Sequence, residues 1–473
     1  MTPITRRRLL GGAFAIIGGA LMPVAACARR PSAEVAAGVI VIGAGIAGLT
    51  AANLLHTAGV AVTVLEARDR IGGRIRTTEV AGTPVDLGAS WIHTPRGNPL
   101  TTLMAELNID TKPLSPDTPV SAYDARLDRL LTAAELRRLD AAYEEFDDAS
   151  DRLSRALGPN ASMQDGIDAF APGPGRALVR TYLGLTVATL DYALSAPDLA
   201  LASQGLYQES LSGPDLIPVG GYGQLVEALA RPIDIRRNQA VQAITAEDSG
   251  IEVRTTVARF RAGTVIVTLP LGVLQSGAVT FSPPLPLEKQ GALDRLRMGH
   301  LEKVVLGYPD GWWRDSRTRL NLAAISDSDS EEYPSFVDLG TPGTTLMCLY
   351  GGRFAQRHAG DSEAEKVRAI GEVLARITGQ QPPAPLEVRA TDWTHDPYSL
   401  GSYSNLAPGA DETDFRALAQ PVGERILFAG EATVPKVYQT VHGAYLSGVR
   451  AAQQAMRGAN EFSFGGAPIL TPG

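Results

Sequence analysis

The stretch Val39–Thr77, VIVIGAGIAGLTAANLLHTAGVAVTVLEARDRIGGRIRT, decides the fold of this chain. It begins with the short apolar run Val39–Ile42, which is typical of a strand buried on both faces of a parallel sheet. Glycines then follow with the spacing G-x-G-x-x-G, where this strand is predicted to pass into a helix. The first glycine permits a tight turn, the second lets a pyrophosphate approach the backbone, and the third lets the helix pack against the sheet. The residues predicted to bind the ligand in this turn are Gly43, Ala44, Gly45, Ile46, Ala47 and Gly48.

An acidic residue completes this unit. The apolar run Val60–Leu65 predicts a second strand, and Glu66 follows it directly. A carboxylate roughly 20 residues after the glycines accepts hydrogen bonds from an adenosine ribose in dinucleotide-binding proteins. The N–H groups and the dipole at the start of the helix favour the anionic phosphates. Together these features predict a dinucleotide-binding unit in an α/β fold.

The next turn, Ala67–Arg74 (ARDRIGGR), indicates which dinucleotide binds. Paired glycines between arginines suggest a second clamp on phosphate, made by backbone N–H and guanidinium groups. A solvated basic loop is the alternative. The stretch resembles the LEAxxRxGGR segment of FAD enzymes in the flavin-containing amine oxidase superfamily. The resemblance implies that FAD binds to Glu66, Ala67, Arg68, Gly73 and Arg74.

The length of 473 residues is too great for one compact core and predicts two interleaved domains. The resemblance implies a FAD-binding Rossmann-like domain of the glutathione reductase type, interleaved with an α+β substrate-binding domain. Within the latter, Thr132–Leu157 is expected to form an amphipathic helix with Thr132 as N-cap and Glu135 in a capping box. We assign residues 36–95, 215–300 and 391–460 to the FAD-binding domain, and 96–214 and 301–390 to the substrate-binding domain.

Residues 1–27 have the pattern of a targeting signal. Thr5–Leu10 (TRRRLL) carries twin arginines, and an uncharged stretch rich in Gly and Ala follows. Val24–Cys27 resembles a lipobox, whose cysteine is lipid-modified after cleavage. A permanent membrane helix over Leu9–Ala26 is the alternative, and it is only marginally long enough. We expect export by the twin-arginine route, with a lipid anchor at Cys27, to the outer face of the cytoplasmic membrane or the periplasm.

The composition argues against two classes of function. The net charge is −8, with 43 Lys+Arg against 51 Asp+Glu and no basic run beyond the N-terminus, so nucleic-acid binding is not expected. Two cysteines and six scattered histidines show no metal-ligand spacing, so no metal site is expected. Cys348 lies in an apolar run and is predicted to be a buried thiol. With Cys27 as the lipid site, no intramolecular disulfide is expected.

Three further segments resemble the amine oxidases that accept polyamines. In the first, Lys303 interrupts the strand-like run Leu301–Tyr308. The pattern alone also fits a surface lysine on an edge strand. The resemblance implies instead that Lys303 reaches the flavin N5 atom through a water and assists reoxidation by oxygen.

The second segment, Trp393–Ser404, contains the Gly-x-Tyr motif of the family. The resemblance implies that Tyr403 places its ring beside the flavin face and orients the amine, whereas a core tyrosine is the alternative. Trp393 is predicted to contact the cofactor. Monoamine oxidases carry a flavin-linked cysteine just before the ring, and this chain has Ser402 there. The FAD is therefore expected to be non-covalent.

The third segment is a strand running into a Gly-Glu turn, Ile426–Glu431, followed by a helix start at Thr440–Gly448. Small residues after a strand bring a helix N-terminus to the cofactor. Thr440 stands where monoamine oxidases have the second ring of their aromatic sandwich, and a threonine there resembles animal polyamine oxidases and histone lysine demethylases. The resemblance implies contacts of FAD with Gly430, Glu431, Thr440 and Val441, and of the adenine with Val241.

A histidine favours a polyamine substrate. The chain has Trp91-Ile92-His93 followed by Gly97-Asn98-Pro99, as in the animal polyamine oxidases. A lone histidine is usually structural, but these surroundings imply that His93 faces the substrate. The predicted catalytic residues are Lys303, Tyr403, His93 and Thr440.

The resemblance implies an FAD-dependent amine oxidase. Hydride would pass from the C–H next to an amine nitrogen to flavin N5, water would hydrolyse the imine to an aldehyde and an amine, and O2 would reoxidise the flavin with release of H2O2. A polyamine substrate is favoured. Ser402 and Thr440 disfavour a monoamine oxidase, and Ser90–His93 stands where an L-amino-acid oxidase would have its carboxylate-binding arginine. A desaturase or porphyrinogen oxidase is not expected to combine Lys303 with Tyr403. A non-catalytic, flavin-bound surface lipoprotein is a further alternative.

Overall fold

The computed structural model describes residues 34–35, 38–113, 121–125, 127–206, 214–315, 321–325, 333–339 and 344–457. The predicted signal 1–27, including Cys27, lies outside the described residues. Among the helices that are described, none is both long and apolar enough to cross a membrane.

A five-stranded, fully parallel sheet forms around the glycine turn, with the strand order β10-β3-β2-β14-β23. The crossover helix α1 (Ile46–Thr57) joins β2 to β3 and packs against α13 (Val441–Arg457). This sheet confirms the predicted α/β fold, and β2 has the predicted bounds. The strands are β2 (Val39–Ile42), β3 (Val62–Leu65), β10 (Asp234–Arg236), β14 (Thr264–Val267) and β23 (Ile426–Phe428).

Strand β2 is buried on both faces, as its continuous apolar run predicts. Val39 and Val41 pack into the core that contains α1 and α13. Ile40 and Ile42 point the other way, into a core shared with a second sheet. Because neighbouring strand residues alternate in direction, each face needs its own cover, and the chain supplies both.

The second sheet has the order β1-β13-β12-β11-β15. The sequence pattern of residues 238–244 predicts a strand there, but the strand begins three residues later, at Val241. Asn238 has a positive φ of 57° and donates its backbone N–H to Arg68, while Gln239 donates to the carbonyl of Glu66. The glycine-rich region therefore holds these residues out of the strand. The strands are β1 (Glu34–Val35), β11 (Val241–Glu247), β12 (Gly250–Thr255), β13 (Arg259–Ala262) and β15 (Thr280–Ser282).

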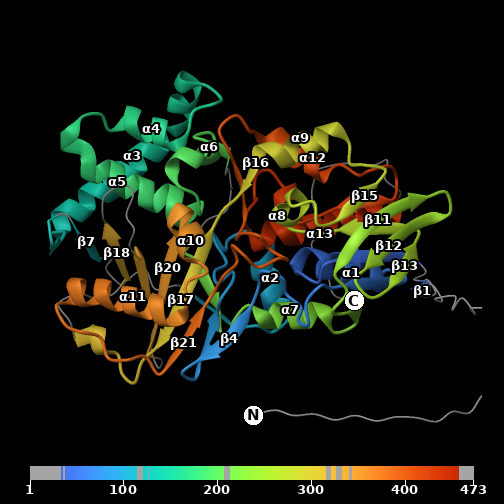
Figure 1. The fold of residues 1–473 in the computed structure, drawn as a ribbon, viewed down its shortest axis with the longest axis horizontal. Helices are drawn as coiled ribbons and strands as arrows, with labels where there is room; N and C mark the ends of the chain where they lie inside the picture. Colours follow the sequence, from blue (N-terminus) through green and yellow to red (C-terminus); the bar gives the residue numbers. More distant parts are fainter. Residues whose placement is uncertain are drawn as a thin grey trace, which may run out of the picture. The chain divides into compact units, whose positions relative to one another are not determined.

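The third sheet has seven strands in the order β21-β17-β20-β19-β18-β7-β8. Helices α10 (Gly352–His358) and α11 (Glu363–Thr378) lie beside it in Figure 1. Cys348 is fully buried in β20, as predicted. The strands are β7 (Ser121–Asp124), β8 (Arg129–Leu130), β17 (Leu301–Gly307), β18 (Asn321–Ile325), β19 (Ser335–Asp338), β20 (Thr345–Gly351) and β21 (Glu387–Ala390).

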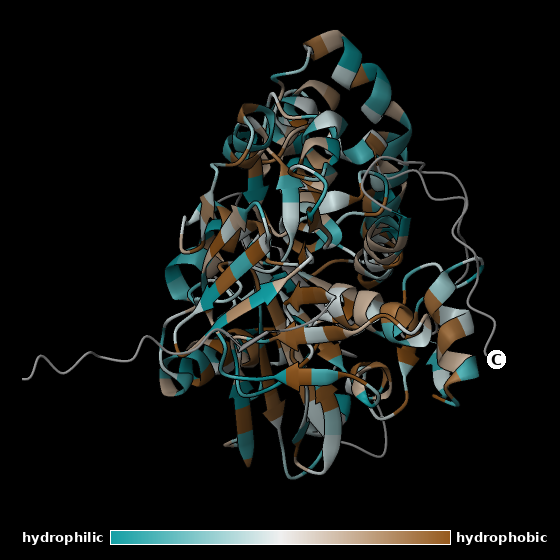
Figure 2. Cartoon of the chain, turned by 90° about the vertical axis from the view of Figure 1, so that its right-hand side faces the viewer, coloured by the Kyte–Doolittle hydropathy of each residue, from teal (hydrophilic) through white to brown (hydrophobic). Residues whose placement is uncertain are grey.

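A helical block contains the long helix α3 (Ala133–Leu157). Its start is as predicted, because Thr132 and Glu135 form a capping box. Helices in the structure carry both polar and apolar residues, as Figure 2 shows. After α4 (Met163–Phe170) and α5 (Ala177–Leu183), the chain winds into a π-helix, Gly184–Asp191. π-Helical turns are rare and often accompany functional sites.

Shorter elements connect these layers. The helices are α2 (Pro99–Glu106), α6 (Ser203–Leu206), α7 (Gly223–Ala230), α8 (Leu271–Gln275), α9 (Leu287–Arg295) and α12 (Glu412–Ala419). The strands are β4 (Thr77–Val80), β5 (Thr83–Asp86), β6 (Thr111–Pro113), β9 (Leu216–Pro218), β16 (Leu296–Met298) and β22 (Ser404–Leu406).

The chain passes repeatedly between the sheets. The parallel sheet takes strands from both ends of the chain and from its middle, whereas the seven-stranded sheet takes its strands from 121–130 and 301–390. The boundaries assigned to the two domains stay a prediction.

Candidate active site

The glycine turn leaves the start of α1 open. Gly43 has a φ of 104°, which L-residues with a side chain rarely adopt. A Cβ at Gly48 would lie 2.0 Å from the carbonyl oxygen of Gly43, so only glycine fits there. A Cβ at Gly45 would meet no described atom within 4 Å, and this residue gives the helix no side-chain cap. The first N–H groups of α1 therefore face open space and can bind an anion.

Glu66 lies directly beside this turn and is buried. Its Oε2 accepts the N–H of Ala44 at 2.8 Å, and its Oε1 accepts the N–H of Arg68 at 2.9 Å. A carboxylate offers about four lone-pair positions, so both oxygens can still accept from a ribose. The backbone thus fixes the carboxylate where the sequence predicted a ribose contact.

The second glycine turn packs on the first. Gly72 donates its N–H to the carbonyl of Ala44 at 2.8 Å. A Cβ at Gly73 would lie 3.4 Å from the Cα of Gly45, so the two turns nearly touch. The paired glycines therefore allow the close approach of two backbone segments beside the open start of α1.

The arginines of this turn contact protein acceptors. Arg68 binds Asp396 at 2.6 Å, and Arg70 donates to the carbonyl of Gly73 at 2.9 Å. These contacts exclude a merely solvated basic loop. They also mean that the guanidinium groups fasten neighbouring loops, and their contact with phosphate stays a prediction.

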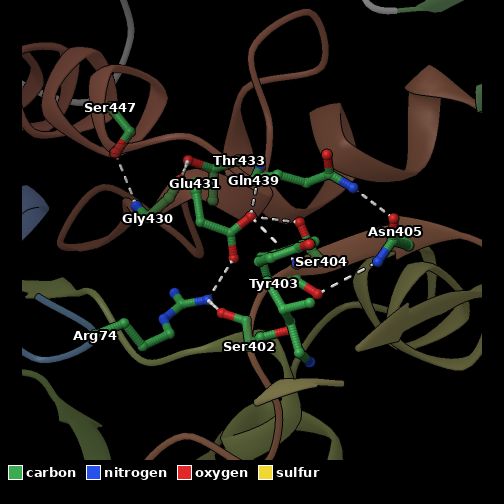
Figure 3. A network of polar contacts seen from close by, with 11 residues as sticks. Arg74, Ser402, Tyr403, Ser404, Asn405, Gly430, Glu431, Thr433, Gln439 and Ser447 are labelled. Atoms are coloured by element: carbon green, nitrogen blue, oxygen red, sulfur yellow. Dashed lines mark hydrogen bonds and ion pairs between the residues drawn. The ribbon is translucent and has the colours of Figure 1, made fainter. Parts of the chain in front are cut away.

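Glu431 is the centre of a polar network that joins distant segments (Figure 3). Its Oε2 accepts the hydroxyl of Ser404 at 2.6 Å and the N–H of Gln439 at 2.9 Å. Its Oε1 accepts Arg74 at 2.9 Å, and Arg74 also donates to the carbonyl of Ser402 at 2.9 Å. The carboxylate is buried but fully hydrogen-bonded, which offsets the cost of burying its charge.

This network positions two predicted site residues. Tyr403 lies between Ser402 and Ser404, both of which the network holds. Thr440 follows Gln439 and caps α13, because its hydroxyl accepts the N–H of Gly443 at 2.9 Å. The sequence predicted only a cofactor contact for Glu431, and the structure adds this supporting role.

Lys303 is buried on β17, between β20 and β21, so it is not a surface lysine on an edge strand. Its Nζ donates to the carbonyl of Gly88 at 2.5 Å, the hydroxyl of Ser90 at 2.6 Å and the carbonyl of Asp86 at 3.0 Å. Burial lowers the pKa of Lys303 to about 8. The three acceptors match the three hydrogens of an ammonium group.

Tyr403 contacts an acidic residue, Asp191, that was not predicted from the sequence. The Tyr403 hydroxyl donates to the carbonyl of Asp191 at 3.1 Å. The Asp191 side chain is accessible to water, yet protein surrounds it closely enough that burial raises its pKa to about 7. The Tyr143 hydroxyl donates to its carboxylate at 3.5 Å, and a nearby positive charge on His93 would lower its pKa. Asp191 therefore lies close to both Tyr403 and His93.

His93 is half exposed, and its Nδ1 lies 2.8 Å from the carboxylate of Asp215. Part of the motif that surrounds it is structural. Asn98 caps α2 by accepting the N–H of Leu100, and it donates to the carbonyl of His93 at 2.9 Å. The Asn-Pro pair thus starts a helix and fixes the histidine backbone.

With this geometry established, comparison with known proteins assigns the family. The sequence pattern of the flavin containing amine oxidoreductases matches residues 46–456. The chain belongs to this family. It is 34% identical over 450 residues to lysine-specific histone demethylase 1 homolog 1 of Oryza sativa subsp. japonica, covering 89% of this chain and 52% of that protein. It is 30% identical over 458 residues to protein FLOWERING LOCUS D of Arabidopsis thaliana, covering 90% and 56%.

The chain therefore spans about half the length of these relatives. Among solved structures, wild-type putrescine oxidase bound to putrescine superposes with a TM-score of 0.75 and 23% identity, covering 89% of this chain and 100% of that chain. This likeness confirms the predicted fold.

As a member of the flavin-containing amine oxidoreductases, the protein uses non-covalent FAD, as predicted. The observed donor set fits this cofactor. The open start of α1 suits the pyrophosphate, and the carboxylate of Glu66 suits the ribose. A small pocket lies further on, between the end of β14 and Gly430, and is lined by Arg74, Glu431 and mainly apolar residues.

The other predicted cofactor residues lie in a loop or at the start of an element. Trp393 is buried and donates its indole N–H to the carbonyl of Leu87 at 3.2 Å. Val241 and Val441 are the first residues of β11 and α13. Their contacts with FAD stay predictions. Within the described part of the chain, no cluster of three His, Cys, Asp or Glu side chains could hold a metal.

Proposed function

We propose that this flavin amine oxidoreductase oxidises positively charged amines of the polyamine type, with O2 as electron acceptor. The observation that carries the proposal is the carboxylate of Asp191, a residue whose backbone carbonyl accepts the Tyr403 hydroxyl and which lies near His93. Polyamines are cations near neutral pH, because the ordinary pKa of an alkylammonium group lies near 10. An ionised carboxylate attracts such a cation, and the protein around it makes this attraction stronger than it would be in bulk water.

The surroundings of Asp191 support a cationic ligand. In the described structure, no lysine or arginine forms an ion pair with it, and its polar neighbours are tyrosines and His93. Burial alone disfavours the charged carboxylate. An ammonium group would reverse this effect and be held by the ionised form. A monoamine has no second ammonium group that this residue could bind while the reacting amine is placed by Tyr403.

The chain's own residues position the amine and keep the site dry. The Tyr403 hydroxyl is anchored on the backbone of Asp191, and both neighbours of Tyr403 are held by the Glu431 network. The ring therefore has one fixed orientation, which is what placing a C–H for transfer requires. FAD, when bound, supplies the hydride acceptor.

Lys303 serves the oxidation of the reduced cofactor. Its ammonium group is a buried, fixed positive charge on β17. Such a charge stabilises the negative charge that develops when O2 is reduced. Removing it should slow reoxidation more than it slows oxidation of the amine.

A methylated lysine side chain is the second candidate substrate. It also carries a C–H next to a charged nitrogen, and the relatives with 30–34% identity include proteins named as lysine-specific histone demethylases. This chain spans only about half of their length, so partners that bind through the rest of those proteins are not implied.

The test is anaerobic mixing of the purified holoenzyme with single amines, followed by absorbance of the flavin. We expect spermine, spermidine or putrescine to bleach the flavin rapidly, and air to restore it with release of H2O2. Bleaching only by benzylamine would indicate a monoamine oxidase, and only by an N-methyl-lysine peptide a demethylase. No bleaching by any amine, including L-amino acids, would contradict catalysis on amines and favour a flavin-bound binding protein.

We infer from the sequence that residues 1–27 direct twin-arginine export and that Cys27 carries a lipid. Cell fractionation of the wild type and of a Cys27→Ser variant tests this inference. The wild type should sediment with membranes and the variant should be soluble in the periplasm. Equal distribution of both proteins would contradict the anchor.

A further inference from the structure

Glu302 stands next to Lys303 on β17, and the structure buries it completely. Its carboxylate accepts four hydrogen bonds from one short loop. The donors are the hydroxyl of Thr391 at 2.5 Å, the N–H of Trp393 at 3.0 Å, and the N–H and hydroxyl of Thr394, both at 2.8 Å. Since neighbouring strand residues point to opposite faces, Glu302 and Lys303 act on opposite sides of the same strand.

The loop needs this carboxylate because the sheet ends there. Strand β21 pairs with β17 as far as Ala390, and the N–H of Thr391 still bonds to the carbonyl of Lys303 at 2.9 Å. The next N–H groups of the loop lie beyond the end of the sheet but still inside the protein. Buried N–H groups without an acceptor are costly, and Glu302 supplies the acceptor.

The four donors also oppose the effect of burial on this carboxylate. Burial raises the pKa of Glu302, while the hydrogen bonds from Thr391, Thr394 and Trp393 oppose the rise. Its recorded partners in the described structure are all neutral donors. A buried carboxylate without a cationic partner is not expected to stabilise the fold strongly. Its role is therefore to place the groups that it binds.

The groups that Glu302 binds are connected to Lys303. Trp393, whose N–H is held by Glu302, donates its indole N–H to the carbonyl of Leu87. The carbonyls on either side of Leu87, those of Asp86 and Gly88, accept from the ammonium of Lys303. Glu302 therefore positions the loop 391–394. This loop in turn positions the carbonyl groups that accept hydrogen bonds from Lys303.

We propose that Glu302 is a positioning residue that fixes the ammonium group of Lys303 through the loop 391–394 and so supports reoxidation by O2. The part that concerns O2 rests on the proposed function. The part that concerns geometry does not, because the place of the ammonium group can be measured directly.

The test compares the wild type with Glu302→Gln, which keeps the shape but removes the charge and two of the acceptor positions. Lysine acetylation of the holoenzyme, followed by mass spectrometry, reports the accessibility of Lys303. The chain has only five lysines, so each can be followed: Lys112, Lys289, Lys303, Lys366 and Lys436. The exposed Lys112 and Lys436 serve as internal references.

We expect acetylation of Lys303 to rise several-fold in Glu302→Gln, with the two reference lysines unchanged. Reoxidation of the reduced flavin by O2 should slow by roughly tenfold or more, since a displacement near 1 Å can cost up to a hundredfold. Anaerobic reduction by the amine should change less. A milder variant, Thr394→Val, removes one donor and should shift both readouts in the same direction, which keeps the test decisive if Glu302→Gln does not fold.

Asp392→Asn is the matched control. This carboxylate lies in the same loop but is partly exposed and bonds to His395. It should leave both readouts unchanged. Unchanged acetylation of Lys303 and an unchanged ratio of reoxidation to reduction in a folded Glu302→Gln would overturn the inference. If no amine reduces the wild type, the proposed function fails, while the acetylation result still decides the role of Glu302.

Discussion

The turn around Gly45 and the region around Tyr403 are built in different ways. The turn is made of backbone groups from one continuous stretch, and its contacts follow from glycine geometry. The region around Tyr403 is made of side chains from segments far apart in sequence, such as Glu431 and Asp191. The first can be read from a local pattern, whereas the second exists only after the chain has folded. Substitutions in the two regions are therefore expected to impair the protein in different ways.

The largest expected effect is in the turn. Gly48→Ala would place a Cβ 2.0 Å from the carbonyl oxygen of Gly43, so the helix must move away from the turn. We expect a loss of about 3 kcal/mol or more of stability and the loss of FAD from the purified protein. The ratio of flavin to protein absorbance measures this. Gly175→Ala is the control, because a Cβ there meets no described atom within 4 Å; a full complement of FAD in Gly48→Ala would disprove the account of the turn.

The next effect separates the two halves of the reaction. Lys303→Met removes the buried charge but keeps the length of the side chain. We expect reoxidation by O2 to slow roughly a hundredfold, by analogy with the loss of a charge-stabilising donor elsewhere. Stopped-flow absorbance of the reduced flavin, mixed with oxygenated buffer, measures it. Lys112→Met should behave as the wild type, and equal slowing of amine oxidation and reoxidation in Lys303→Met would argue against the assigned role.

A third prediction concerns the choice of substrate. Asp191→Asn removes the negative charge of this carboxylate, so the KM for putrescine should rise roughly tenfold to a hundredfold, since hydrogen bonds to charged groups contribute about 1.5–3 kcal/mol. The KM for n-butylamine, which has the same carbon chain but one amine, should change little. Steady-state release of H2O2 measures both. Asp198 is a surface carboxylate paired with Arg353, and Asp198→Asn should change neither KM value. An equal rise of KM for the two amines would mean that Asp191 does not bind the second ammonium group.

The same residue predicts a pH dependence. The pKa of Asp191 is raised by burial to about 7, so its charged form increases as the pH rises through that value. Binding of a cationic amine should therefore strengthen from pH 6 to 8. The profile of kcat/KM for putrescine tests this, and Asp191→Asn should lose the rise near pH 7. A wild-type profile without that step would contradict the role of the carboxylate.

The smallest effect belongs to a hydroxyl. Tyr403→Phe keeps the ring but removes the bond to the carbonyl of Asp191. A single hydrogen bond contributes about 1 kcal/mol, which corresponds to a change of roughly fivefold. We expect kcat for putrescine to fall by about that factor, with FAD content unchanged. A fall as large as that in Asp191→Asn would mean that the ring itself had lost its place.

The sequence predicted the backbone-made parts most closely. Strand β2, the capping box at Thr132 and the burial of Cys348 follow from local periodicity, local capping chemistry and composition, and each is observed. The start of β11 was predicted three residues early, because Asn238 and Gln239 bond to the distant loop after Glu66.

Two important side chains were beyond a local reading. Asp191 ends a π-helix, which has no sequence signature, and nothing nearby distinguishes it from other acids of the helical block. The donors to Glu302 lie about 90 residues further along the chain. Such contacts depend on how strands pair, so they become visible only in the folded chain.

The most direct test of the account is the anaerobic rate of flavin reduction by putrescine and by n-butylamine, measured with the wild-type holoenzyme at pH 8. The account predicts much faster reduction by the dication, because Asp191 holds the second ammonium group while Tyr403 orients the first. Equal rates for the two amines, or faster reduction by n-butylamine, would contradict it.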